Sequence, residues 1–150
     1  MNIFEAIRAD HEKQRTLLSI LTKTHGDSKG REEIYARLKR ELETHESAEE
    51  RFFYAPLIQD DLTQEKARHS VAEHHEIDEL IETLDATDFS SSAWLVHAKK
   101  LQELVEHHLE EEEHEVFQMA GKALSDARKV SLANQYQAEM TRLREEHESV

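Results

Sequence analysis

Apolar residues recur every three or four positions along most of this chain, a spacing that predicts helix almost throughout. The first apolar stripe consists of Phe4, Ile7, Leu18 and Leu21. We expect this helix to end near Thr24, before a turn at residues 25–30 that holds two of the three glycines. The second stripe consists of Ile34, Leu38, Leu42 and Phe52. Pro56 is expected to end or kink the second helix, because proline disfavours helical geometry at the residue before it.

The second half of the chain repeats this organisation. The residues expected to cap a third helix are Asp60, Asp61 and Thr63, and its apolar face consists of Val71, Ile77, Ile81 and Leu84. After a polar turn at residues 88–92, the apolar face of a fourth helix consists of Leu101, Leu104 or Val105, Val116 and Met119. Gly121 is expected to interrupt the pattern before a fifth helix, capped by Ser125 or Asp126, with Val130, Leu132, Tyr136 and Leu143 inward. The fold class predicted is all-α.

The two halves are related by an internal repeat at an offset of 63 residues. The offset places His11 on His74, His45 on His108 and Glu49 on Glu112. Apolar positions coincide at the same offset: Leu38 with Leu101, Leu42 with Val105, and Tyr54 with Phe117. A chance cluster of histidines would not carry its apolar neighbours along, so the repeat predicts two helical hairpins related by a pseudo-two-fold axis.

The four repeated histidines should lie at one level of the bundle. In an antiparallel pair, residues at equal depth are equally far from the turn between the helices. The midpoint of His11 and His45 is residue 28, inside the first expected turn, and the midpoint of His45 and His74 falls between residues 59 and 60, inside the second. The midpoint of His74 and His108 is residue 91, at the edge of the third turn. This agreement predicts an up-down-up-down four-helix bundle with an additional C-terminal helix.

Composition narrows the class of protein. The 150 residues, 37% hydrophobic and 35% charged, suit one helical domain, and no apolar run approaches the ~20 residues of a membrane span. The start shows no export signal, so we expect a cytoplasmic protein. The formal net charge of −14 argues against nucleic acid and anionic membrane as partners. The absence of cysteine excludes disulfides and thiolate metal sites.

The repeated residues have the chemistry of a metal centre. Each His-x-x-x-Glu pair, His45 with Glu49 and His108 with Glu112, places an imidazole and a carboxylate one turn apart on one helix face. Nitrogen and oxygen ligands without sulfur suit iron, manganese or zinc. Two bridging carboxylates, four histidines and an oxygen bridge would leave about two of twelve positions open on two six-coordinate metals. Such openings suit water, dioxygen, peroxide or nitric oxide.

The other histidines are interpreted differently. His75 and His107 lie about 100° around the helix from the repeated histidines and have no partners in the repeat, so they are interpreted as flanking residues. The histidines interpreted as surface residues are His25, His69, His97, His114 and His147. A bundle without metal would have to bury the carboxylates of Glu49 and Glu112 unpaired, which is expensive.

The ordered motifs resemble the haemerythrin-like family, also called the HHE cation-binding domain. They are Asp10-His11, the segment at residues 45–50, Glu73-His74, and the segment at residues 108–113 followed by Val116-Phe117. The resemblance covers about residues 1–120 and implies a four-helix bundle with a non-haem centre of two iron ions, with manganese or zinc ranked behind. Residues 121–150 lie outside it and are expected to pack on the bundle as an added helix.

The chain departs from the oxygen-carrying members of this family. Asp78 stands where those carriers have a second histidine in the third helix, and Glu113 stands at their spacing for the last carboxylate. Glu112 and Glu113 therefore stay alternatives at that position. Glu46, directly after His45, is an additional ligand candidate, as a neighbouring glutamate is in iron-sensing members. The centre thus resembles bacterial and regulatory HHE domains more than dioxygen carriers.

The leading hypothesis is a di-iron protein that binds or reduces a small oxidant, namely peroxide, dioxygen or nitric oxide. Glu46 or Tyr54 would serve as the proton donor in an enzymatic version. The alternative is a binding or sensing module without turnover, in which iron or oxygen occupancy controls the fold. The repeat and the resemblance do not choose between them.

Overall fold

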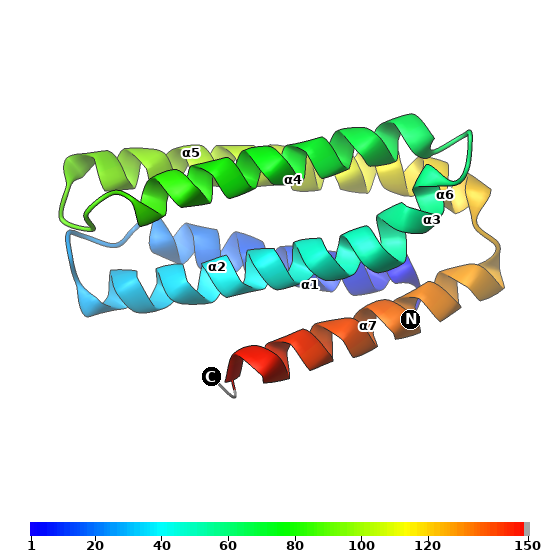
Figure 1. Cartoon of the computed structure of the whole chain (residues 1–150), viewed down its shortest axis with the longest axis horizontal. Coiled ribbons are helices and arrows are strands. Elements are labelled where there is room, and N and C mark those ends of the chain that lie inside the picture. The colour runs from blue at the N-terminus through cyan, green and yellow to red at the C-terminus, as the bar shows by residue number, and fades with distance from the viewer. Residues whose placement is uncertain (149–150) are drawn as a thin grey trace.

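The computed structural model describes residues 1–148, which are all-α and contain no strand. Helices α1 (Ile3–Leu21) and α2 (Lys29–Glu49) form the first hairpin, and α4 (Gln64–Asp85) and α5 (Ser92–Glu111) form the second. Figure 1 shows the two hairpins as antiparallel layers, with α7 (Asp126–Glu148) lying along α1 and α2. The predicted bundle with an additional C-terminal helix is confirmed.

Helix ends follow local side-chain chemistry. Asn2 and Glu5 form a reciprocal capping box that starts α1, and Ser28 and Ser91 cap α2 and α5. Helix α1 ends at Leu21, earlier than the predicted Thr24, because the Thr24 hydroxyl donates to the Leu21 carbonyl at 2.6 Å. The turn that follows holds Gly26 in the left-handed region at φ 52°, which suits a residue without a side chain.

The second and fourth helices each continue through a π-helical turn. Segment η1 (Glu50–Tyr54) joins α2 to α3 (Ala55–Ile58), and η2 (Glu112–Val116) joins α5 to α6 (Phe117–Ala123). Both turns begin at or directly after a glutamate of the repeated motif. Such single π turns are frequent at functional sites. Because the two π turns lie at equivalent places in the two halves, the internal repeat is present in the backbone geometry as well as in the sequence.

Helix boundaries differ from the sequence predictions at three places. Pro56 is predicted to end or kink the second helix; the chain changes to π-helical geometry at Glu50–Tyr54, continues through Pro56 and ends its helix at Ile58. The predicted caps of α4 do not cap it, since the Thr63 hydroxyl donates to the Leu57 carbonyl instead. Gly121 lies inside α6, which ends at Ala123 where the next residue adopts extended geometry.

Helix α7 packs against the first hairpin through four buried residues: Leu132, Ala133, Tyr136 and Met140. Its start was predicted correctly, because the Ser125 side chain accepts from the Arg128 amide. Val130 was predicted to face inward but is 46% exposed, because the inward face begins two residues later. Tyr136 is the largest residue of this face and reaches the centre of the bundle.

The apolar core is divided into two clusters. One lies at the end of the bundle with α3 and α6 and includes Ile7, Phe53 and Phe117, and the other lies toward the hairpin turns and includes Leu18 and Trp94. In sequence, each repeated histidine stands between residues of the two clusters. A polar layer therefore crosses the middle of the bundle. Within residues 1–148, no helix is long and apolar enough to span a membrane.

Candidate metal centre

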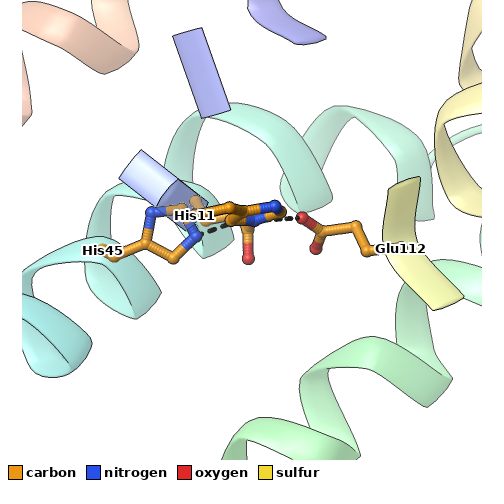
Figure 2. Close-up of side chains that lie close together, drawn as sticks. His11, His45 and Glu112 are labelled. Carbon is orange, nitrogen blue, oxygen red and sulfur yellow. Dashed lines mark ion pairs between the residues drawn. The ribbon is translucent and has the colours of Figure 1, made fainter. Parts of the chain in front are cut away.

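The structure brings together all six residues that the repeat singles out. They are His11 on α1, His45 and Glu49 on α2, His74 on α4, His108 on α5 and Glu112 at the start of η2. All six are buried, with exposed fractions of 3% or less. Potential ligand atoms lie within 4.8 Å of one another in two groups, one made of His11, His45, Glu49 and Glu112, the other of Glu49, His74 and His108. Figure 2 shows how His11, His45 and Glu112 converge.

Each glutamate spans the two hairpins with its two oxygens. Glu49 Oε2 lies 3.2 Å from His45 Nε2, and Glu49 Oε1 lies 3.2 Å from His74 Nε2. Glu112 Oε1 lies 3.1 Å from His11 Nε2, and Glu112 Oε2 lies 3.9 Å from His108 Nε2. Two histidines and one oxygen from each glutamate thus face each of two neighbouring positions. This is the arrangement expected of two carboxylates that bridge a pair of cations.

Buried atoms of the centre lack hydrogen-bond partners. Those facing the two positions are Nε2 of His11 and His45 and both carboxylate oxygens of Glu49 and Glu112. A buried polar atom without a partner costs free energy, and so many in one place call for a ligand that is absent from the protein itself. Cations at the two positions would satisfy all of these atoms. The residues present therefore fit a two-metal site.

Three of the four histidines are held from behind through Nδ1. His11 Nδ1 donates to Glu113 Oε2 at 2.7 Å, and His108 Nδ1 donates to Glu73 Oε1 at 2.9 Å. His45 Nδ1 lies 2.6 Å from the hydroxyl of Tyr136. A proton held on Nδ1 leaves the Nε2 lone pair directed at the centre, as metal-binding histidines require. His74 differs, because its Nδ1 has no hydrogen-bond partner and lies 3.6 Å from Glu50 Oε2.

The partner of His45 belongs to a chain of contacts that starts on α7. The Tyr136 hydroxyl donates to Asp10 Oδ2 at 2.6 Å, so it accepts the proton of His45 Nδ1. Arg144 donates to Asp10 Oδ1 at 2.9 Å and to Glu41 Oε1 at 2.7 Å. The C-terminal helix therefore orients a histidine of the centre through a phenol and a carboxylate.

Sequence reasoning missed the roles of Tyr136, Asp10 and Glu73. Tyr136 lies 91 residues from His45, and nothing in the spacing of α7 indicates which of its apolar residues reaches the centre. The two acids were visible in the repeat, because Asp10 and Glu73 occupy equivalent positions before His11 and His74. Each supports a histidine of another helix, Glu73 directly and Asp10 through Tyr136. The acids at these equivalent positions were therefore the one feature of the sequence that could have indicated the residues supporting the histidines.

The other candidates lie around the centre. Glu113 bonds to His11 Nδ1 and Arg15 and so stands behind the cluster, whereas Glu112 faces it. Glu46 is buried beside Asp78 and belongs to neither group of ligand atoms. Tyr54 is fully buried, its hydroxyl has no hydrogen-bond partner, and its ring lies 5.7 Å from that of His74.

The flanking histidines point outward. His75 is exposed and belongs to neither buried group of ligand atoms. The side chain of His107 is 70% exposed, whereas that of His108 is 3% exposed. The repeat therefore predicted correctly that His74 and His108 face the interior and that their neighbours His75 and His107 face solvent.

Burial and neighbouring charges set unusual protonation states. Burial lowers the pKa of His11 to about 4, so its imidazole is neutral. Burial and the charge of Glu49 raise the pKa of Glu112 well above its ordinary value. Burial opposes the charge of Glu49 itself, but His45 and His74 hold the pKa of Glu49 well below its ordinary range. Without a cation, the two carboxylates therefore resist ionising together, and cation binding would displace a proton.

Comparison with known proteins agrees with this geometry. A family model described as "Hemerythrin HHE cation binding domain" matches residues 2–120. The fold is similar to that of an HHE cation-binding domain-containing protein from Mycobacterium kansasii, with a TM-score of 0.89 at 20% identity, covering 97% of this chain and 89% of that one. A curated protein named DNA nickase from Nostoc sp. is 24% identical over 145 residues. That match covers 97% of this chain but 41% of the Nostoc protein, so the chain spans less than half the length of this relative.

Proposed function

Because the chain belongs to the haemerythrin family of HHE cation-binding domains, we propose that it holds two iron ions at the buried centre. The ligands proposed are His11, His45, Glu49, His74, His108 and Glu112. The observation that carries this assignment is the pair of glutamates, each with one oxygen beside a histidine of either hairpin. Nitrogen and oxygen donors suit iron, and manganese or zinc rank behind it.

The proposed activity is the binding or reduction of a small oxidant, namely peroxide, dioxygen or nitric oxide. Six protein ligands, two of them bridging, together with an oxygen bridge leave about two of twelve positions on two six-coordinate metals for such a molecule, and a closed structural site would leave none. When bound, the iron pair supplies the electrons and the binding positions for that chemistry. The protein residues contribute enclosure, orientation and protons.

Glu46 is the proposed proton donor. Burial raises its pKa to about 9, so the carboxyl group holds a proton at neutral pH. It lines a surface cleft of about 540 Å³ together with Asp78 and Glu50, and Glu50 Oε2 lies 3.6 Å from His74 Nδ1. The carboxyl of Glu46 therefore lines a cleft open to solvent, from which it can be reprotonated, and the charge of His74 acts on it. The buried phenol of Tyr54 is the alternative donor on the side of His74.

A sensing function without turnover is the second candidate. It is favoured by α7, which lies beyond the family match and yet is bonded to His45 through Tyr136. Occupancy of the centre would then be transmitted to the packing of the C-terminal helix. DNA nicking, the activity in the name of the Nostoc relative, is not carried over. The net charge of −14 opposes contact with a phosphate backbone.

The decisive experiment is metal analysis of iron-loaded protein, together with its absorption spectrum and peroxide and nitric oxide assays. We expect two iron ions per chain and near-ultraviolet charge-transfer bands. His74→Ala and His108→Ala should each lose at least one iron, whereas the control His75→Ala keeps both. Turnover above that of free iron supports the enzyme, and binding without turnover supports the sensor. An iron-free protein with unchanged spectrum would refute both.

A further inference from the structure

The outer surface of α4 and α5 carries a ring of alternating imidazoles and carboxylates. In order around the ring these are His69, Glu111, His107 and Glu73. His69 Nε2 lies 3.2 Å from Glu111 Oε1, and His107 Nε2 lies 3.2 Å from Glu111 Oε2. Glu73 Oε2 closes the ring at 3.6 Å from His69 Nε2 and 4.0 Å from His107 Nε2. Both histidines thus present Nε2 to the same two carboxylates.

The ring is built from the same spacing as the buried centre. His69 with Glu73 and His107 with Glu111 are both His-x-x-x-Glu pairs, so each helix places an imidazole and a carboxylate on one face. Because α4 and α5 are antiparallel neighbours, each histidine meets the glutamate of the other helix. The interpretation of His69 as a plain surface residue overlooked this contact. Neither histidine has a counterpart at the 63-residue offset, so the repeat could not reveal it.

One carboxylate of the ring is oriented in advance. Glu73 Oε1 accepts from His108 Nδ1 at 2.9 Å, and this bond directs Glu73 Oε2 toward His69 and His107. The side chain of Glu73 is only 8% exposed, whereas those of His69 and His107 are 55% and 70% exposed. A cation could therefore reach the ring from solvent without opening the bundle.

Within residues 1–148, the two carboxylates of the ring form no ion pair with a lysine or an arginine. In this part of the chain, the ion-pair partners within 4 Å of Glu73 and Glu111 are all histidines. A metal-binding imidazole is uncharged. In that form, two carboxylate charges face two nitrogen lone pairs. Because uncharged imidazoles do not neutralise the two carboxylates, this set of groups attracts a cation.

We propose that this ring is a second divalent-cation site, separate from the buried centre, that takes one first-row metal ion of the zinc or ferrous type. Zinc binds histidine nitrogen and carboxylate oxygen at about 2.0–2.2 Å, which places tetrahedral ligand atoms roughly 3.3–3.6 Å apart. His69 Nε2 lies close to this spacing from Glu111 Oε1, at 3.2 Å, and from Glu73 Oε2, at 3.6 Å. Potential ligand atoms of His69, Glu73 and Glu111 all lie within 4.8 Å of one another. His107, whose Nε2 lies 3.2 Å from the second oxygen of Glu111 and 4.0 Å from Glu73 Oε2, is the fourth ligand proposed.

The test is equilibrium dialysis of the full chain against zinc, after the buried centre has been saturated with iron. We expect the wild type to bind one zinc per chain and His69→Ala/His107→Ala to bind less than a tenth of that, with unchanged iron content. The control His75→Ala/His114→Ala replaces two other exposed histidines, one on α4 and one in η2, and should keep the zinc. Glu111→Gln, which preserves side-chain size, should lose it.

The same dialysis on metal-free protein separates this proposal from that of the buried centre. A difference of one zinc between wild type and His69→Ala/His107→Ala, with or without iron, supports the ring site even if the centre binds no iron. The proposal is overturned if the iron-loaded wild type takes up no zinc. It is also overturned if the double variant and Glu111→Gln keep the zinc, because the ion would then lie elsewhere.

Discussion

At the scale of single residues, the centre is defined by the burial of two carboxylates. Glu49 and Glu112 are both within 1% of complete burial, and neither has a hydrogen-bond partner for its oxygens. Such a pair would weaken an ordinary core, because each ionised carboxylate loses its hydration and repels the other. A pair of cations bound between the two carboxylates would offset this cost, because the cations would be attracted by both charges.

Glu112→Gln should therefore have opposite effects with and without metal. The substitution preserves size but removes a bridging charge, so the iron-loaded variant should lose at least one iron. The metal-free variant should be as stable as wild type or more stable, because the pKa of Glu112 is already raised by burial and by Glu49. Iron content and urea unfolding of both forms check this.

Glu113→Gln is the matched control, one residue along the same helix. Glu113 supports His11 from behind, so its loss should weaken iron binding by about 10- to 100-fold without changing the number of irons at saturation. If Glu113→Gln removed iron and Glu112→Gln did not, the last ligand would be Glu113 and the spacing of the oxygen carriers would apply.

Glu46 makes the stability of the metal-free protein depend on pH. Its pKa is about 9 in the folded protein, raised by burial from an ordinary value of 4.5. Between these values the folded form holds a proton that the unfolded form releases, so stability falls as pH rises. Glu46→Gln should remove this dependence. Between about pH 6 and about pH 8.5, the urea midpoint of the variant should therefore rise relative to that of wild type. A constant difference across that range would contradict a raised pKa at Glu46.

At the scale of helices, the positions of the proposed ligands were predictable because helix geometry is periodic. A histidine and a glutamate four residues apart share a face, and equal distances from a turn give equal depth in the bundle. Those two rules brought His11, His45, Glu49, His74, His108 and Glu112 to one level, as the structure has them. The π turns were not predictable, because no residue pattern marks the extra residue that they contain.

The contribution of α7 was beyond sequence reasoning for a different reason. Its apolar stripe predicts that it packs on the bundle, but the partner of a buried phenol depends on how the helix docks. The bond from Tyr136 to His45 joins residues that only the tertiary fold brings together. The ring of His69 and His107 was not predicted from the sequence for the same reason, since it depends on contacts between helices.

Tyr136→Phe tests whether α7 supports the metal centre. The substitution keeps the ring but removes the hydroxyl that accepts from His45 and donates to Asp10. Iron affinity should fall by about 10- to 100-fold, the range seen when an outer partner of a ligand is lost. Competition with a chelator measures the affinity, and circular dichroism checks that the helices are retained.

Tyr35→Phe provides the control for this experiment. Tyr35 is also a buried tyrosine whose hydroxyl donates to a carboxylate, Asp85 at 2.7 Å, but it lies in the cluster toward the hairpin turns. It should lower stability without lowering iron affinity. Equal losses of affinity in the two variants would mean that Tyr136 acts only through general packing.

At the scale of the whole molecule, the centre links all four helices of the bundle. Each glutamate faces one histidine of either hairpin, so a bound cation pair would join the two hairpins through several ligand bonds at once. Because the unfolded chain does not hold these ligands together, the free energy of metal binding adds to the free energy of unfolding. The apolar clusters on either side hold the hairpins together, and the buried carboxylates between them reduce the stability of the metal-free bundle.

Removing the metal should therefore destabilise the bundle as a unit. A metal present at a thousand times its dissociation constant adds about 4 kcal/mol to the free energy of unfolding, or roughly 10 °C in Tm for a chain of this length. Chelation should lower the Tm by that order, and readdition of iron should restore it. His69→Ala/His107→Ala should show the same shift, because its buried centre is intact. If complete removal of iron left the Tm unchanged, the metal would not be bound between the hairpins. Its ligands would then have to come from a single pair of helices.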